Sequence, residues 1–278
     1  MTVLVTGATG LLGAYLVDLL SELGPVTATS RSGTAQPCNL TDADAVTSLI
    51  RTVDPAVVVH TAALTDVDGC EEDPARAEAL NANATAHLAD TLASSAQLVY
   101  ISTDQVYPDT AGTHREGGES PVNVYGWSKL AGERAALKHP AALVLRTNFF
   151  GPSKTLGRQS LSDFVECNLR DGNAITLFDD VLFSPLHIET LGLLIAEMIS
   201  GRISGVFNTG SREGMSKADF AFHIARHLRL STDTARRGQS SEMPGRAPRP
   251  KDLRMDVSHI EAVLGRPMPT LSQEVEKL

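Results

Sequence analysis

Short apolar runs alternate with amphipathic stretches through the first half of this chain, and that alternation constrains its fold more than any other feature. The apolar runs, each of the kind that forms a buried parallel strand, are residues 3–5, 26–28, 57–59, 98–101 and 143–145. The stretches expected to be helical are 11–23, 43–52, 75–93 and 124–138. The alternation predicts an α/β fold with a doubly wound parallel sheet, which binds ligands at the carboxyl ends of its strands.

The first apolar run leads directly into a glycine-rich turn. Gly7, Gly10 and Gly13 stand at every third position before the first expected helix. Glycine permits a tight turn and a close approach of backbone to phosphate, and a helix N-terminus favours negative charge. The turn therefore predicts a site for the pyrophosphate of a dinucleotide. The alternative is a generic strand-to-helix turn that contains three glycines.

The end of the second expected strand indicates which nicotinamide dinucleotide is bound. An acidic residue about 20 positions after the glycines holds the ribose hydroxyl of NAD, whereas an arginine accommodates the extra phosphate of NADP. Here the strand runs into Thr29-Ser30-Arg31-Ser32, which contains no acid. Arg31 therefore predicts NADPH. NADH, with Arg31 as a solvated loop residue, is the alternative.

Tyr125 and Lys129 form the candidate catalytic pair. Residues four apart on a helix share a face, so the ammonium group is expected to lie close to the phenol. A nearby positive charge lowers the pKa of tyrosine from its free value of about 10. The pair therefore predicts a tyrosine that exchanges a proton with substrate near neutral pH. The alternative is a tyrosine that only packs against its neighbours.

In the second half of the chain, strand-like and helix-like segments alternate less regularly. Helices are expected at 160–170, 188–200, 217–228 and 257–264, and a loop at 236–250. We divide the chain into a dinucleotide-binding domain at 1–150 and a smaller substrate-binding part at 151–278. The second part is expected to be interleaved with the sheet.

Composition excludes several classes of partner. The net charge of -9 argues against nucleic-acid binding, which requires clustered positive charge. The longest apolar stretch, 191–199, is too short to span a membrane, and the chain enters a strand without a signal peptide. Three widely spaced cysteines predict a reducing compartment. We therefore expect a cytoplasmic protein with neither a membrane nor a nucleic-acid partner.

The histidines do not indicate a metal site. His60, His87 and His187 lie in separate apolar segments without ligand spacing. They are expected to be structural, and no metal is predicted.

Several motifs in order indicate a known family. The chain resembles the extended short-chain dehydrogenase/reductases, and within them the dTDP-4-dehydrorhamnose reductase group. The motifs that carry this resemblance are the glycine turn at Gly7, Ser102-Thr103-Asp104, Tyr125-Gly126-Trp127-Ser128-Lys129, Arg146-Thr147-Asn148, and Arg249-Pro250-Lys251-Asp252-Leu253. The resemblance covers almost the whole chain.

The resemblance implies a Rossmann-type fold, a nucleotide-sugar substrate and a catalytic triad of Thr103, Tyr125 and Lys129. The cofactor delivers hydride to a ketone, Tyr125 protonates the alkoxide, Thr103 binds the carbonyl oxygen, and Lys129 holds the nicotinamide ribose. The implied cofactor-binding residues are Gly7, Thr9, Gly10, Leu11, Gly13, Arg31, Asn39, Leu40, Ala62, Ala63, Tyr125 and Lys129. The implied substrate-binding residues are Val67, Thr103, Asp104, Gln105, Tyr125, Asn148, Phe149 and Arg249.

Departures from the family pattern concentrate on the substrate side. Gln105 stands where the family usually has tyrosine, Phe149 where it has tryptophan, and 183–186 reads Phe-Ser-Pro-Leu where Gly-x-Pro-Thr is usual. On the cofactor side, Asn39 replaces an aspartate but can still bind adenine. Polar groups in a binding site discriminate strongly between substrates. These departures therefore leave the substrate less well defined than the type of reaction.

The leading interpretation is an NADPH-dependent reductase of a nucleotide-activated 4-keto-deoxysugar. Alternatives are a reductase of a small non-sugar aldehyde or ketone, a sugar-nucleotide epimerase, and a non-catalytic regulatory subunit like that of methionine adenosyltransferase. A homodimer is left open, since no residue pattern locates an interface.

Overall fold

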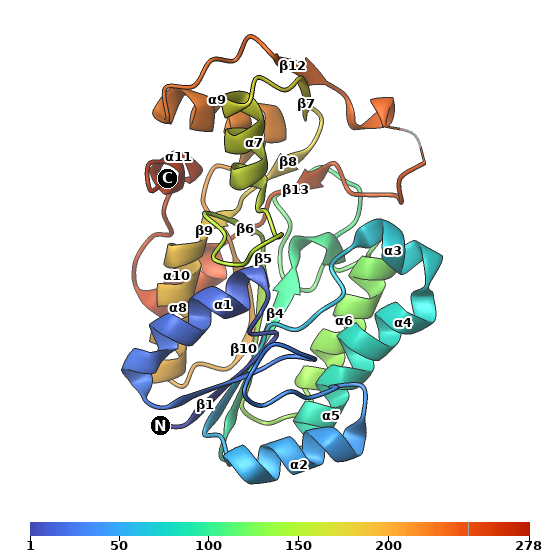
Figure 1. Cartoon of the computed structure of the whole chain (residues 1–278), viewed down its shortest axis with the longest axis vertical. Helices are drawn as coiled ribbons and strands as arrows, with labels where there is room; N and C mark the ends of the chain where they lie inside the picture. The colour runs from blue at the N-terminus through green and yellow to red at the C-terminus, as the bar shows by residue number, and fades with distance from the viewer. Residues whose placement is uncertain (244) are drawn as a thin grey trace.

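The computed structural model describes residues 1–243 and 245–278, and a parallel sheet lies at its centre (Figure 1). Six strands of the described chain form this sheet in the order β10-β5-β4-β3-β1-β2. Every pairing within it is parallel. The strands are β1 (Val3–Thr6), β2 (Val26–Thr29), β3 (Val57–His60), β4 (Gln97–Thr103), β5 (Ala142–Thr147) and β10 (Gly205–Thr209). The five predicted strands and the α/β class are confirmed.

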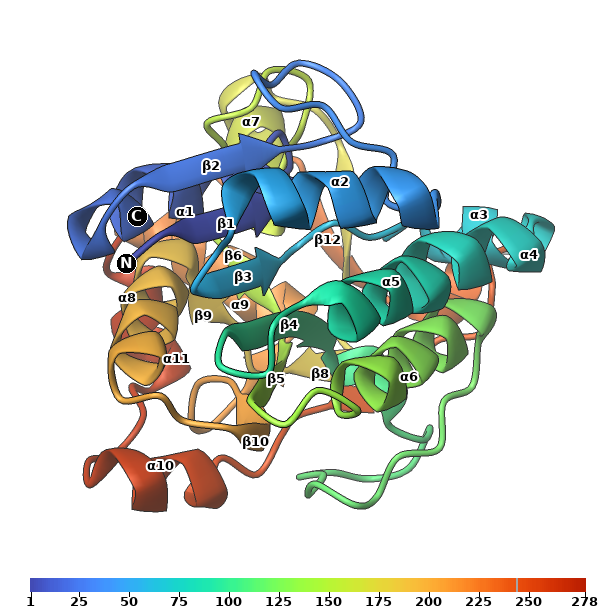
Figure 2. The same cartoon turned by 90° about the horizontal axis from the view of Figure 1, so that it is seen from below.

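Helices cover both faces of the sheet, as Figure 2 shows from below. One face carries α1 (Leu11–Leu20) and α8 (Ile188–Ser200). The other carries α2 (Ala43–Val53), α5 (Ala84–Thr91) and α6 (Val124–Ala136). Side chains alternate along each strand, so β1 directs Val3 and Val5 to one layer and Leu4 to the other. The arrangement is a doubly wound, Rossmann-like sheet.

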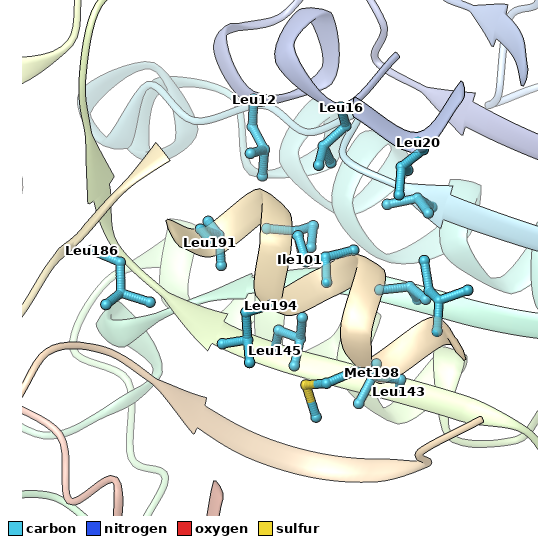
Figure 3. Packing of buried hydrophobic residues seen from close by; sticks show 14 of the residues in the cluster. Leu12, Leu16, Leu20, Ile101, Leu143, Leu145, Leu186, Leu191, Leu194 and Met198 are labelled. Atoms are coloured by element: carbon cyan, nitrogen blue, oxygen red, sulfur yellow. The ribbon is translucent and has the colours of Figure 1, made fainter. Parts of the chain in front are cut away.

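The layer under α1 and α8 forms one apolar core (Figure 3). Leu12, Leu16 and Leu20 recur at intervals of four on α1 and are buried against the sheet. Leu194 and Met198 do the same on α8. Burying a leucine side chain stabilises a fold by about 1.5–3 kcal/mol. This core fixes the start of α1, and with it the glycine turn.

The expected helix at 75–93 is present but interrupted. It comprises α4 (Pro74–Glu78), a π-helical turn (Ala79–Asn83) and α5, and α3 (Val67–Glu72) precedes it. The π turn brings the Asn81 side chain to α6, where its amide nitrogen donates to the Ser128 hydroxyl at 2.9 Å. Gly132 of α6 packs against the same turn, since a Cβ there would lie 2.3 Å from the Asn81 carbonyl oxygen. The turn therefore helps set the position of the helix that carries Tyr125.

The second half builds a smaller layer at one end of the sheet (Figure 1). All four expected helices are present, as α7 (Leu161–Arg170), α8, α9 (Lys217–His227) and α10 (Ser258–Leu264); α11 (Leu271–Val275) follows. The short strands are β6 (Phe149–Phe150), β7 (Ile175–Phe178), β8 (Leu182–Phe183), β9 (Leu186–His187), β11 (Met215–Ser216), β12 (Ala235–Gly238) and β13 (Asp252–Leu253). They pair as β12-β7, β6-β9 and β11-β8-β13.

The second half differs from expectation in its strands, none of which was predicted. The predicted loop at 236–250 is wrong at its start, because residues 235–238 form β12, which pairs in parallel with β7. The strand β10 was not predicted, and it joins the central sheet beside β5. The domain boundary at residue 150 stays a prediction.

The described residues contain no helix that is both long and apolar enough to cross a membrane.

Candidate active site

A cavity of about 670 Å³ lies at the carboxyl ends of the central strands. It begins where β1, β2, β3 and β4 end, the position at which open α/β sheets bind ligands. Most of the predicted site residues line it: Gly7, Thr9, Gly10, Leu11, Gly13, Arg31, Asn39, Leu40, Ala62, Ala63, Thr103, Asp104, Gln105, Tyr125, Lys129, Asn148 and Phe149. Their convergence from distant parts of the chain makes the cavity the candidate active site.

The glycine turn forms the floor of this cavity below the N-terminus of α1. Gly7 has a φ of +67°, which favours glycine, and a Cβ there would lie 2.6 Å from the Ala62 backbone nitrogen. A Cβ on Gly13 would lie 2.2 Å from the Gly7 carbonyl oxygen. The turn can therefore close only with glycine at both positions. It leaves the first turn of α1, which has no acidic residue, open to the cavity.

The turn after β2 supplies the wall beside this floor. Ser30 and the exposed Arg31 line the cavity, and the backbone of Cys38 returns to donate to the Ser30 carbonyl at 2.9 Å. The side-chain oxygen of Asn39 accepts a hydrogen bond from the Thr41 hydroxyl at 2.9 Å. Arg31 brings a guanidinium group to this part of the cavity.

Tyr125 lies in the first turn of α6. The Asn123 side chain caps this helix by accepting the Gly126 amide at 2.7 Å. The Tyr125 side chain is 8% exposed and packs in a cluster with Val67 and Cys70. Burial raises the pKa of Tyr125 above its ordinary value, although the Thr103 hydroxyl opposes this shift. The phenol therefore holds its proton at neutral pH.

Lys129 is buried one turn farther along α6. Its ammonium donates to the Ile101 carbonyl at 2.7 Å and lies 4.0 Å from the centre of the Tyr100 ring. Burial lowers the pKa of Lys129 to about 7, and the carboxylate of Glu133 acts in the opposite direction. The expectation that Lys129 lowers the pKa of Tyr125 is wrong for this structure, because burial dominates and the ammonium is engaged by the β4 backbone.

A buried ion pair fixes α6 to the sheet next to these residues. Arg146 of β5 donates to both carboxylate oxygens of Glu133, at 3.0 Å and 2.6 Å. The Ser102 hydroxyl donates to the same carboxylate at 2.5 Å. Arg146 also pairs with Glu119. Bidentate pairing of this kind sets geometry as well as energy, so it holds Tyr125 and Lys129 at the end of β4.

Asp104, which follows Thr103 at the end of β4, is a buried carboxylate that lines the cavity. The Thr103 hydroxyl donates to it at 3.1 Å and the Asn148 amide at 2.8 Å. Burial raises the pKa of Asp104 to about 6, and these hydrogen bonds and the half-buried Lys217 act against that rise. Asp104 therefore orients two predicted substrate-binding side chains while it changes charge near pH 6.

This shift predicts a pH-dependent effect of Asp104→Asn. The folded protein holds the Asp104 proton more tightly than the unfolded chain, so stability is lost as pH rises from about 4 to 6. The variant removes that cost, and its free energy of unfolding should exceed that of the parent by about 3 kcal/mol at pH 8. Below about pH 4 the two should agree. Urea denaturation at both pH values measures this, and a gain independent of pH would contradict it.

Two predicted substrate-binding residues do not line the cavity. Val67 packs in the cluster that contains Tyr125. Arg249 forms an ion pair with Asp68 at 2.9 Å and donates to the Ala247 carbonyl at 3.0 Å. The segment 183–186 also lies elsewhere, since Phe183 belongs to the core of the second half. The roles proposed for Val67 and Arg249 stay predictions.

The cavity also contains residues that the sequence analysis did not identify. Arg76 of α4 and Arg158 and Gln159 of the loop before α7 line it. Thr61 lines it as well, and its hydroxyl donates to the Thr6 carbonyl at 2.6 Å. Thr61 directly precedes Ala62 and Ala63, so its position in the sequence could have indicated it. The arginines lie in no recognisable motif.

No group of three or more potential metal ligands occurs within the described residues.

Comparisons with known proteins agree with this geometry. The family model described as RmlD substrate binding domain matches residues 1–278. The "Probable low-salt glycan biosynthesis reductase Agl14" of Haloferax volcanii is 31% identical, with 100% of this chain and 97% of that protein covered. Methionine adenosyltransferase 2 subunit beta of Mus musculus is 32% identical, with 94% of this chain and 82% of that protein covered.

A solved structure shares the entire fold. The crystal structure of a dTDP-4-dehydrorhamnose reductase from Clostridium acetobutylicum superimposes with a TM-score of 0.90 at 25% identity. The superposition covers 100% of this chain and 98% of that one. The resemblance drawn from the sequence motifs is therefore confirmed. With the family model matched from end to end, this chain belongs to the RmlD substrate-binding domain family.

Proposed function

We propose that this protein is an NADPH-dependent carbonyl reductase that reduces a ketone of a nucleotide-activated 4-keto-deoxysugar. Its oxidoreductase class agrees with the reductases to which it is similar. The observation that carries the proposal is that one cavity contains the glycine turn together with Thr103, Tyr125 and Lys129. A dinucleotide site and a protonated phenol in the same cavity are what reduction of a carbonyl requires.

The residues of the floor fit a dinucleotide. The backbone packs so closely at Gly7 and Gly13 that no side chain fits there, and the N-terminus of α1 favours a pyrophosphate. Arg31 offers a positive charge for the extra phosphate of NADPH. NADPH, when bound, supplies the hydride. The protein's own residues then have to orient the carbonyl group and provide the proton.

In the proposed reaction, Tyr125 is the proton donor. Its raised pKa keeps the phenol protonated, so a proton is available as the carbonyl oxygen becomes an alkoxide. The Thr103 hydroxyl hydrogen-bonds to the same oxygen and stabilises the developing charge. Lys129 holds the nicotinamide ribose. One hydride and one proton convert the ketone to an alcohol.

Substrate recognition is proposed for the part of the cavity that lies at the ends of β4 and β5. Asp104, Gln105, Asn148 and Phe149, which follow these strands, line the cavity. Val67 and Arg249 are proposed to act from the adjoining segments, with the substrate-binding part at 151–278. A small non-sugar aldehyde or ketone remains the alternative substrate, because Gln105 and Phe149 depart from the family pattern.

Replacing Arg31 with alanine should weaken NADPH binding about tenfold while changing NADH affinity less than about twofold. The reason is that only NADPH carries the phosphate that the guanidinium neutralises. Fluorescence titration of both cofactors measures the difference. Equal losses for the two cofactors would show that Arg31 does not recognise this phosphate.

A non-catalytic regulatory function is the second candidate. The similarity to methionine adenosyltransferase 2 subunit beta over 94% of the chain favours it. The test is consumption of NADPH against a panel of 4-keto sugar nucleotides, including dTDP-4-dehydrorhamnose, and simple aldehydes. Turnover of a panel member supports the reductase. NADPH binding without turnover of any of them, together with co-purification of a larger enzyme, supports the regulatory function.

A further inference from the structure

The loop between β6 and α7 reaches into the cavity from the second half of the chain. Arg158 and Gln159 of this loop line the same cavity as Gly10 and Leu11 of the first half. In Figure 1 the loop passes beside the N-terminal end of α1. The loop therefore faces the part of the cavity where the glycine turn lies.

Three contacts join this loop to α1 and the residue before it. The ammonium of Lys154 forms an ion pair with Asp18 at 2.7 Å and lies 4.6 Å from the centre of the Tyr15 ring. The Thr155 hydroxyl lies 3.5 Å from the carbonyl oxygen of Gly10, at the outer limit of a hydrogen bond. These contacts bring the loop to the first turn of the helix.

The loop is also anchored at its two ends. The Gly151 amide donates to the Ser162 hydroxyl at 3.0 Å, which joins the start of the loop to α7. At its other end Ser160 caps α7, with reciprocal hydrogen bonds to Asp163 at 2.8 Å and 3.1 Å. A short loop fixed at both ends restricts the positions that Arg158 can reach.

Arg158 provides a positive charge that pairs with no acidic side chain in the described part of the chain. It belongs to none of the ion pairs formed between described residues. Its side chain is exposed and lines the cavity. The neighbouring glycine turn is itself a region of positive potential, because the first amides of α1 have no partner within the helix and its first turn contains no acid. The α1 N-terminus and the Arg158 guanidinium therefore both place positive charge beside the same part of the cavity, which suits an anion with two negative charges.

We propose that Arg158 binds the pyrophosphate of the dinucleotide, and that the loop 151–160 is a strap across the cofactor opposite the glycine turn. This inference rests on the proposed dinucleotide cofactor and adds a binding residue from the second half of the chain. Arg158 acts on a group that NADPH and NADH share, whereas Arg31 acts on the phosphate that only NADPH carries.

Equilibrium binding of NADPH and NADH to Arg158→Ala tests the proposal without any substrate. Both affinities should fall by the same factor, about three- to tenfold, as expected for loss of a partly exposed charged contact. Arg226→Ala, which removes an exposed arginine of α9 outside the cavity, controls for the change in net charge and should leave both affinities unchanged. The same comparison with Arg31→Ala should show a loss confined to NADPH.

Two results would overturn the inference alone. One is unchanged affinity of Arg158→Ala for both cofactors, and the other is a loss for NADPH only, which would assign Arg158 to the extra phosphate. Failure of the unaltered protein to bind either dinucleotide would overturn the proposed function together with this inference.

Discussion

Replacing Tyr125 with phenylalanine is expected to reduce turnover by about a hundredfold or more, the usual scale for a lost acid-base group. NADPH affinity should stay the same, because the variant keeps the ring in its buried cluster and removes only the hydroxyl. Tyr125 should stay protonated in the parent enzyme between pH 6 and pH 9. Even the ordinary tyrosine pKa of about 10 lies above this range, and the pKa of Tyr125 is raised further. Initial rates of NADPH consumption with the best panel substrate measure the effect.

Tyr15→Phe is the matched control for that experiment. It removes a phenol from α1, outside the residues that line the cavity, and should leave turnover within about twofold of the parent. If Tyr125→Phe also kept parental turnover, Tyr125 would not be the proton donor. If it lost NADPH binding in parallel with turnover, its role would be in holding the cofactor.

Replacing Glu133 with alanine is expected to lower the free energy of unfolding by about 3 kcal/mol, the lower end of the scale for breaking a buried ion pair, because Glu119 still pairs with Arg146. The variant leaves the Arg146 guanidinium, 3% exposed, without its bidentate partner. It also leaves the Ser102 hydroxyl without its acceptor. Urea denaturation at pH 7 measures the loss.

The exposed pair between Glu166 and Arg170 on α7 provides the control. Glu166→Ala should change the free energy of unfolding by about 0.5 kcal/mol or less, since exposed ion pairs contribute little. A loss for Glu133→Ala as small as that of the control would show that the buried pair does not hold α6 to the sheet.

The sequence predicted the middle of the central sheet well because β1, β3, β4 and β5 are buried on both faces. The runs at 57–59 and 98–101 are almost entirely apolar, and each became part of a central strand. The strand β10 was missed because its sequence, Gly-Val-Phe-Asn-Thr, has only two apolar residues before it reaches the asparagine. That residue, Asn208, is fully buried, and the Tyr107 hydroxyl donates to it at 2.6 Å. A partner so distant in the chain gives no local signal.

The site was predictable where a local motif determines the geometry. Glycine spacing identified the cavity floor, and the motifs around Thr103, Tyr125 and Lys129 placed three side chains in one cavity. The electrostatics were not predictable, since the pKa of Tyr125 depends on burial among residues from other elements. Arg158 was missed for a similar reason, because its position depends on how the loop before α7 docks on α1.

Transfer of deuterium from NADPH labelled at the reactive nicotinamide carbon to a 4-keto-deoxysugar nucleotide tests the central claim most directly. The proposed function predicts that the product carries one deuterium at the former carbonyl carbon, one for each NADPH oxidised, and that Tyr125→Phe slows its appearance. Conversion of the sugar without net oxidation of NADPH would indicate epimerase chemistry. No labelled product from any 4-keto sugar nucleotide tested, with NADPH bound, would contradict the account.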